Sequence, residues 1–461
     1  MKSINKTTLI NVASTILLQG IAVITTPIFT RVLGTAQYGI YAVFYSWVTI
    51  LSCVAGLGVG SSLGTALYHF KNTYYEFRSS ILVLGSIISL FMIIAGLLFA
   101  HFHGACFGYN GILLVLLFAF AYAHYTIGFA QTAFIYEKRA NYNFVLSVGL
   151  SVATTVLSLY LINFMGSEMK YKARIFGMAI PYITIAIYVW IILFKKKPIG
   201  MRWEYSRYAL KMGFPVVFHS LAKNVLSQSD RIMMKNMRVS SSEIGIYSFY
   251  CTFIAVMTTI LSALNTSWCP FYYDDLEQHM YDKLKIKCKN YIELFSVLIV
   301  GFLLLSREVS YFMSGEEYVK EVEIIPILAV SVYFMFMYQF PVNFEFFHKR
   351  TRLIAIGTVG AAVLNIILNF IMIRRWGMFG AAAATTISYM ALFFLHYTIV
   401  KNMKKENFHL KVIAFCPGIV GIIIGVIMFY IFQNMWYLRW LLGFTIGVVE
   451  LFRMYRRKSI F

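Results

Sequence analysis

The chain has 461 residues, of which 60% are hydrophobic and only 13% are charged. Soluble globular domains have about 45–50% apolar and about 25% charged residues, so this composition excludes a soluble multidomain protein. A transmembrane helix needs about 20 apolar residues, which leaves room for roughly twelve to fourteen and excludes a single-span receptor. The formal charge of +21 would suit a nucleic-acid or anionic partner, but cytoplasmic loops of membrane proteins are also rich in Lys and Arg.

Apolar runs between polar breaks predict fourteen membrane spans. The first run is too long for the apolar region of a signal peptide, so we expect a retained first helix. The seventh run is the weakest, because it contains Lys223, Asp230 and Arg231. The longest breaks, expected to be loops, are 195–209, 272–287 and 307–322. The predicted spans are 7–30, 40–66, 79–100, 110–135, 143–164, 174–194, 210–235, 244–271, 288–306, 323–345, 353–373, 378–400, 410–432 and 436–455.

The distribution of basic residues predicts the topology. If the N-terminus is inside and the spans alternate, 27 of the 40 Lys and Arg residues fall on inside segments and 11 on outside segments. This bias predicts an even number of spans and two cytoplasmic termini. It also assigns most of the positive charge to membrane topology, so no nucleic-acid partner is expected.

Two short matches indicate an internal repeat. Gly39–Tyr41 recurs as Gly245–Tyr247 at an offset of 206, and Glu137–Arg139 matches His348–Arg350 at an offset of 211. Each match links a helix to the helix six spans later, which predicts a parallel repeat. The expected fold is an all-α polytopic membrane protein of 12–14 helices, with two six-helix lobes around a central cavity and two further C-terminal helices.

The corresponding domain prediction has three parts. Residues 1–200 and 201–405 would form the two lobes, and residues 406–461 would form two extra helices and a basic cytoplasmic tail. Rocking of the two lobes, which exposes a central site alternately to either side, is the usual mechanism of such a parallel repeat.

The seventh predicted helix has a broad polar face. Helical spacing places Asn224, Gln228 and Arg231 on one stripe and Lys223 and Asp230 on the adjacent one. Charges at mid-membrane are costly and normally face a water-filled cavity, so this face predicts a binding surface for an anionic substrate. Two alternatives stay open: an ion pair of Asp230 with Lys223 or Arg231 that locks the helix, or a shallower helix whose cations reach the membrane surface.

The first predicted helix has a milder polar stripe that includes Gln19 and Thr30 and ends near Arg31. Pro27 predicts a kink in it. Cavity lining and hydrogen bonding between helices explain this stripe equally well. Helices one and seven are equivalent in the two repeats, which favours a shared cavity.

Catalytic signatures are absent from the sequence, which has no HExxH, GxSxG or P-loop pattern. The six cysteines form no CxxC motif, so neither a metal site nor a disulfide framework is expected. We therefore predict a transport protein, not an enzyme, with no cofactor. Its energy would come from an ion gradient with H⁺ or Na⁺ as the coupling ion, from the membrane potential, or from substrate supply.

Four segments have a pattern that is typical of one family: Thr30–Tyr41, Ser229–Met234, Glu243–Ser248 and Trp376–Thr385. Together they resemble Wzx-type polysaccharide flippases of the multidrug/oligosaccharidyl-lipid/polysaccharide exporter superfamily. The resemblance implies twelve core helices, often with two more, in the bacterial cytoplasmic membrane. It implies movement of an undecaprenyl-diphosphate-linked oligosaccharide, such as an O-antigen or capsule unit, to the outer leaflet. Membrane lipids and polysaccharide polymerase or export proteins are the partners it implies.

The same resemblance implies that cavity cations bind the diphosphate, for which Arg31, Lys223 and Arg231 are the candidates. A cation-coupled multidrug exporter of the same superfamily is the main alternative. It would be expected to have acidic cavity groups, but Asp230 is the only acid in the middle of a predicted span, and it lies beside Arg231. A membrane polymerase or glycosyltransferase is a further alternative that lacks its sequence signatures and a sizeable outside loop.

Overall fold

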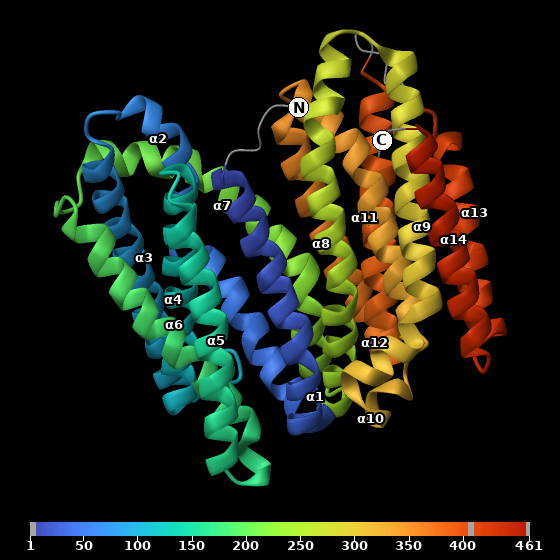
Figure 1. The fold of residues 1–461 in the computed structure, drawn as a ribbon. Helices are drawn as coiled ribbons and strands as arrows, with labels where there is room; N and C mark the ends of the chain where they lie inside the picture. The colour runs from blue at the N-terminus through green and yellow to red at the C-terminus, as the bar shows by residue number, and fades with distance from the viewer. Residues whose placement is uncertain (1–5, 404–409, 458–461) are drawn as a thin grey trace. The chain divides into compact units, whose positions relative to one another are not determined.

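The computed structural model describes residues 6–403 and 410–457, and for residues 6–20, 22 and 23 it describes the backbone alone. The described chain is almost entirely helical, which confirms the predicted all-α class (Figure 1). Its helices form two compact units. Unit 1 runs up to Lys235 and includes Ser240–Ser242, and unit 2 comprises Asn236–Val239 and the chain from Glu243 onward. The lobe ranges predicted from the repeat follow sequence symmetry, not packing, and stay a prediction.

Unit 1 contains seven α-helices among its described residues, joined by short loops and two 3₁₀ turns, η1 (Val59–Ser62) and η2 (Ser167–Met169). Its helices are α1 (Lys6–Ala55), α2 (Leu63–His69), α3 (Tyr74–His103), α4 (Gly111–Tyr136), α5 (Ala140–Phe164), α6 (Lys170–Lys195) and α7 (Trp203–Asn236). Large apolar side chains of α3, α4 and α6, such as Phe77, Phe129 and Leu193, form one core of this unit.

Unit 2 contains seven α-helices in its described part and one 3₁₀ turn, η3 (Val412–Phe415). The helices are α8 (Ser241–Glu277), α9 (Tyr281–Ser314), α10 (Glu316–Val319), α11 (Ile324–Phe347), α12 (Thr351–Lys401), α13 (Cys416–Ile431) and α14 (Trp436–Arg457). Nine helices among all described residues are long and apolar enough to cross a membrane, so the chain is a multi-pass membrane protein.

Two very long helices each contain two of the predicted spans. The backbone of α1 leaves helical geometry at Gly34 (φ 68°), and that of α12 does so at Gly377 (φ 50°, ψ −128°). Both are conformations that glycine adopts without the clash of a side chain. The sequence predicted a kink in α1 at Pro27. The break lies seven residues further on, at Gly34.

Several predicted loops are helical. α8 continues to Glu277, α9 begins at Tyr281 and continues to Ser314, and α7 begins at Trp203. The predicted breaks at 272–287 and 307–322 were therefore too long. Their charged residues were read as loop signals, but a helix keeps its backbone hydrogen bonds when it extends beyond the hydrocarbon layer, so polar composition there does not end it.

Side chains from neighbouring helices satisfy backbone N–H groups where two helices begin. The Glu243 carboxylate of α8 accepts a hydrogen bond from the N–H of Met378, directly after the break in α12, at 2.7 Å. In unit 1, the Gln37 amide oxygen of α1 accepts one from the N–H of Tyr171 in α6 at 2.9 Å. The first N–H groups of a helix have no partner within the helix, so these side chains act as caps.

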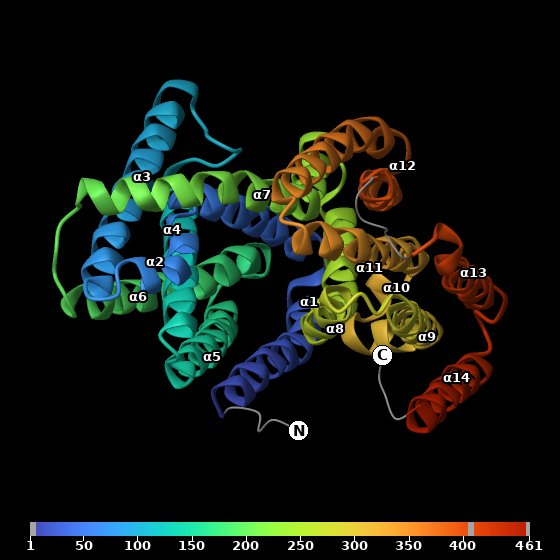
Figure 2. The same cartoon turned by 90° about the horizontal axis from the view of Figure 1, so that it is seen from above.

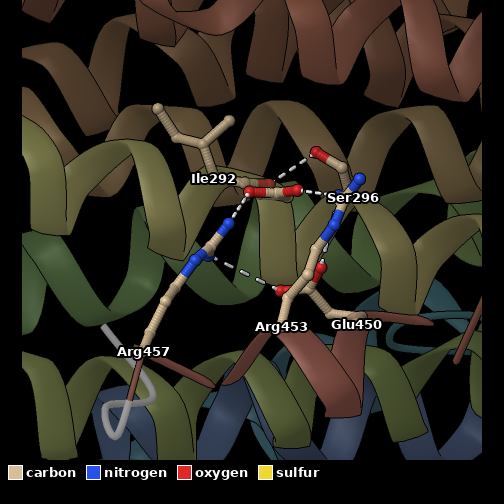
Figure 3. A network of polar contacts seen from close by, with 6 residues as sticks. Ile292, Ser296, Glu450, Arg453 and Arg457 are labelled. Carbon is tan, nitrogen blue, oxygen red and sulfur yellow. Dashed lines mark hydrogen bonds and ion pairs between the residues drawn. The ribbon is translucent and has the colours of Figure 1, made fainter. Parts of the chain in front are cut away.

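The two C-terminal helices pack against α9 on one side of unit 2 (Figure 2). Glu293 of α9 accepts hydrogen bonds from Arg453 and Arg457 of α14, the latter at 2.8 Å (Figure 3). At the other end of α14, Trp440 and Arg439 donate to the Glu308 carboxylate, Trp440 at 3.2 Å. Because Glu293 and Glu308 lie roughly 22 Å apart along α9, α14 is fixed to it at two separate levels.

Candidate functional site

α7 lies antiparallel to the second half of α1. The Ser46 hydroxyl of α1 donates to the Gln228 amide oxygen at 3.1 Å, and Asn224 Nδ2 donates to Cys53 Sγ at 3.2 Å. Further along, a side chain at Gly213 would meet backbone atoms of Leu57 and Gly58 at under 3.0 Å, so glycine is required for this close approach. The contact positions rise along α1 while they fall along α7, which defines the antiparallel register.

Gln228 joins the two helices to an arginine. Its amide oxygen accepts hydrogen bonds from Ser46 and from Arg231 Nη1, the latter at 2.9 Å. The same Arg231 nitrogen donates to the backbone oxygen of Ser227 at 3.0 Å. These contacts hold the guanidinium in one position, and a fixed guanidinium loses little conformational entropy when it binds an oxyanion.

The polar face combines buried and exposed charges. Asp230 is 2% exposed and Arg231 is 8% exposed, whereas the charged Lys223 and the uncharged Ser227 are exposed on the same helix. Burying ionised groups in an apolar bundle is costly unless they are paired or bind a charged ligand. The face therefore offers a fixed arginine, a lysine that can reach out, and the amides of Asn224 and Gln228 as hydrogen-bonding groups.

The predicted residues of the first helix are placed differently. Arg31 is exposed and precedes the break at Gly34 by less than one turn. Thr30 is buried, and its hydroxyl donates to the backbone oxygens of Thr26 and Pro27 at 3.0 and 3.2 Å. Those bonds are local, as is usual for a threonine within a helix. The side chain of Gln19 lies outside the described residues.

Sequence reasoning missed Arg174 of α6. Its guanidinium carbon lies 3.5 Å from the centre of the Phe29 ring and 5.3 Å from that of Tyr41, and Nη1 donates to Ser158 at 2.9 Å. Both rings belong to α1, on either side of its break. Arg174 begins a predicted span, so it was counted as an outside loop cation, and only its position at the start of an apolar run could have marked it.

Two buried contacts between ionisable side chains were also missed. In unit 1, Arg78 of α3 pairs with Glu137 at the end of α4. In unit 2, His396 of α12 lies 2.9 Å from the Glu345 carboxylate of α11, and both side chains are fully buried. A Glu and a His within two predicted apolar spans were a usable signal, because polar side chains at such positions need partners.

Unit 2 also has a buried amide cluster on α12. Asn369 donates to the Asn365 amide oxygen at 3.1 Å, and Asn365 donates to the Thr385 hydroxyl at 3.2 Å. These residues join the two halves of α12 on either side of Gly377. Among the described residues, no group of three or more His, Cys, Asp or Glu side chains could hold a metal ion.

Comparisons with known proteins bear on both the family and the fold. A family model described as "Polysaccharide biosynthesis protein" matches residues 4–273. Protein 1 of the Lsg locus of Haemophilus influenzae is 19% identical over 351 residues, which cover 74% of this chain and 84% of that protein. An uncharacterized membrane protein of the same organism is 22% identical over 346 residues, with 72% and 81% covered.

Two solved structures show the fold. The lipid II flippase MurJ in an inward closed conformation superposes with a TM-score of 0.75 at 16% identity, covering 97% of this chain and 99% of its own. An inward-facing multidrug resistance MATE family transporter of the MOP superfamily superposes with a TM-score of 0.60 at 11% identity, covering 86% and 99%. These matches confirm the predicted class of polytopic membrane fold.

Proposed function

Because the chain belongs to the polysaccharide biosynthesis protein family and is a multi-pass membrane protein, we propose that it is a flippase for an undecaprenyl-diphosphate-linked oligosaccharide. It would move the glycan-bearing head of this lipid from the cytoplasmic to the outer leaflet of a bacterial cytoplasmic membrane by alternating access. In this proposal both termini are cytoplasmic, and the MurJ-like fold supports the transport class.

The observation that carries the proposal is the polar face of α7, where Arg231 is held by Gln228 and Ser227. A diphosphate cannot cross the hydrocarbon layer unless cations neutralise its charge. Placing an unpaired ion in the membrane interior costs roughly several kcal/mol of free energy. A fixed guanidinium donates paired hydrogen bonds to phosphate oxygens, and these charge-assisted bonds are stronger than neutral ones.

In this proposal the cations of the face neutralise the diphosphate, and its amides orient the sugars. Arg231 would bind one phosphate, and the exposed Lys223 would follow the second as the head group moves. Asn224 and Gln228 carry both donors and acceptors, which suits sugar hydroxyls. Exposed Arg31 would make the first or last contact of the diphosphate on the α1 side, while the prenyl chain stays in lipid.

The main alternative is a cation-coupled multidrug exporter, because a MATE transporter has the same fold. Such a protein needs acidic groups for its coupling cations and cationic drugs. Asp230 is acidic, but its neighbour Arg231 and nearby Lys223 give the described face of α7 a positive excess. This balance supports an anionic substrate over a cationic one.

A reconstituted assay separates these functions. Vesicles containing the protein and a fluorescent undecaprenyl-diphosphate oligosaccharide are treated with a membrane-impermeant quencher, and the rate at which the label changes leaflet is measured. We expect Arg231→Gln to lower this rate by about tenfold or more, since one charge-assisted hydrogen bond contributes about 1.5–3 kcal/mol. Lys223→Gln should lower it less, because an exposed ammonium is replaced by water more easily.

Lys211→Gln is the matched control, because Lys211 is an exposed cation on the same helix at the far end from Arg231. It should leave the flipping rate unchanged. Thermal unfolding of each variant separates lost transport from lost folding. Wild-type protein that exports a cationic dye but does not move the labelled lipid would refute the flippase proposal in favour of the multidrug exporter.

A further inference from the structure

A pocket of about 360 Å³ lies in unit 1 where the start of α3 meets the ends of α4 and α6. This basic pocket contains none of the α7 residues discussed above, so it is a separate site. The lining residues that matter here are four cations and two apolar side chains: Arg78, Arg139, Lys195, Lys196, Phe134 and Ile192.

Arg78 forms a rigid part of the wall. Its side chain is 1% exposed, Nη2 donates to the backbone oxygen of Leu193 at 2.8 Å, and Nη1 donates to the Glu137 carboxylate. Because these two contacts fix it, the Arg78 guanidinium contributes a fixed positive charge to the wall of the pocket.

The charges around the pocket do not balance. Glu137 is the carboxylate beside it, and Arg78 and Arg139 share that single group, Arg139 at 3.4 Å. Lys196 Nζ lies 3.4 Å from the centre of the Tyr75 ring, whose other near cation is Arg78 at 5.0 Å. The pocket thus gathers four cations beside the Glu137 carboxylate, and a bound anion would offset this positive excess.

The apolar part of the wall indicates what kind of anion fits. Ile192 of α6 lines the pocket and is 37% exposed. Because α6 is long and apolar enough to cross a membrane, this exposed side chain offers an apolar surface to a lipid acyl chain. Inorganic phosphate would use only the cations, whereas a phospholipid would use both surfaces. The volume is in the range of about 300–1,000 Å³ that is usual for small-molecule sites.

We propose that the basic pocket binds the phosphate of an anionic glycerophospholipid, with an acyl chain along the exposed Ile192 side chain. Basic pockets between transmembrane helices at the cytoplasmic surface are suited to anionic head groups. The bound lipid would tie together the ends of three helices of unit 1. This proposal does not depend on the flippase function, because it concerns a different surface and a structural lipid, not a transported one.

The test compares lipids by native mass spectrometry and thermal unfolding of the full chain in detergent. The probes are phosphatidylglycerol, phosphatidylcholine with the same acyl chains, and soluble glycerol 3-phosphate. We expect phosphatidylglycerol to bind and raise the unfolding temperature, and the other two to have little effect. In the double variant Arg139→Gln/Lys196→Gln, the affinity for phosphatidylglycerol should fall about tenfold or more.

The matched control is Lys138→Gln/Lys197→Gln. These lysines are the exposed sequence neighbours of the pocket residues, do not line the pocket, and carry the same total charge. The control should stay within about twofold of wild type. Equal losses in the two double variants would reduce the effect to general surface charge and overturn the site. Equal stabilisation by glycerol 3-phosphate, or by phosphatidylcholine, would overturn the assignment to an anionic lipid.

Discussion

Units 1 and 2 contain the same contact built from different chemical groups. In unit 1 the amide of Gln37 caps the start of α6 through Tyr171, and in unit 2 the carboxylate of Glu243 caps the second half of α12 through Met378. The two acceptors are 206 residues apart, which is the offset of the Gly39–Tyr41 repeat. The two contacts are therefore equivalent positions of the internal repeat.

The difference shows which part of this contact the fold requires. Both copies supply an oxygen to an N–H that its own helix cannot satisfy, so the acceptor is the shared requirement. The Gln37 amide also donates to the backbone oxygen of Ser167, which a carboxylate cannot do. The Glu243 carboxylate adds negative charge at a helix N-terminus, which the helix dipole favours. One copy thus gains a second hydrogen bond and the other gains charge.

The largest effect is expected at Gly377, where α12 leaves helical geometry beside the Glu243 cap. Gly377→Ala should lower the free energy of unfolding by about 3 kcal/mol, because φ 50° and ψ −128° strain an alanine and its Cβ would lie 2.0 Å from the capping Glu243 oxygen. Denaturation of the purified protein, followed by tryptophan fluorescence, measures this change.

Gly360→Ala in the same helix is the control, because a side chain there would meet open space and its backbone is helical. It should be neutral or slightly stabilising, since alanine favours a helix by roughly 1 kcal/mol over glycine. If the two alanine variants unfold alike, the break at Gly377 does not depend on glycine.

A smaller effect is expected from neutralising the second cap. Glu243→Gln keeps an oxygen for the Met378 N–H but removes the charge, so stability should fall by about 1 kcal/mol. Glu316→Gln, an exposed glutamate at the start of α10, should change stability by less than about 0.5 kcal/mol. Equal shifts in the two variants would mean that the charge of Glu243 does not contribute to capping.

The sequence predicted the helical class and the membrane spans because apolar runs of about 20 residues are a strong local signal. It also aligned the two copies through Gly39–Tyr41. Gln37 and Glu243 each lie two residues before one of the matching tripeptides. The sequence could not predict that they cap helices more than 130 residues away. Such contacts depend on how helices pack, and no local pattern encodes the partner.

The same limit applies to the candidate site. Helical spacing placed Asn224, Gln228 and Arg231 on one stripe, since i, i+3 and i+4 positions share a face. It gave no means of finding Ser46 and Cys53, which meet that stripe from α1. Arg78 was read as a loop cation because it sits at the edge of an apolar run, although the structure buries it.

The smallest effect should come from giving unit 1 the acidic cap of unit 2. Gln37→Glu retains an acceptor for the Tyr171 N–H and adds a negative charge near the start of α6, which contributes about 0.3–1 kcal/mol. It also loses the donor to the Ser167 oxygen and places a carboxylate beside that carbonyl, which costs about 0.5–1.5 kcal/mol. The two terms nearly cancel, so the unfolding free energy should change by less than about 1 kcal/mol. Gln37→Ala loses both hydrogen bonds, so it should lower the free energy of unfolding more than Gln37→Glu does. If the two variants lower it equally, the acidic cap of unit 2 cannot replace the amide cap of unit 1.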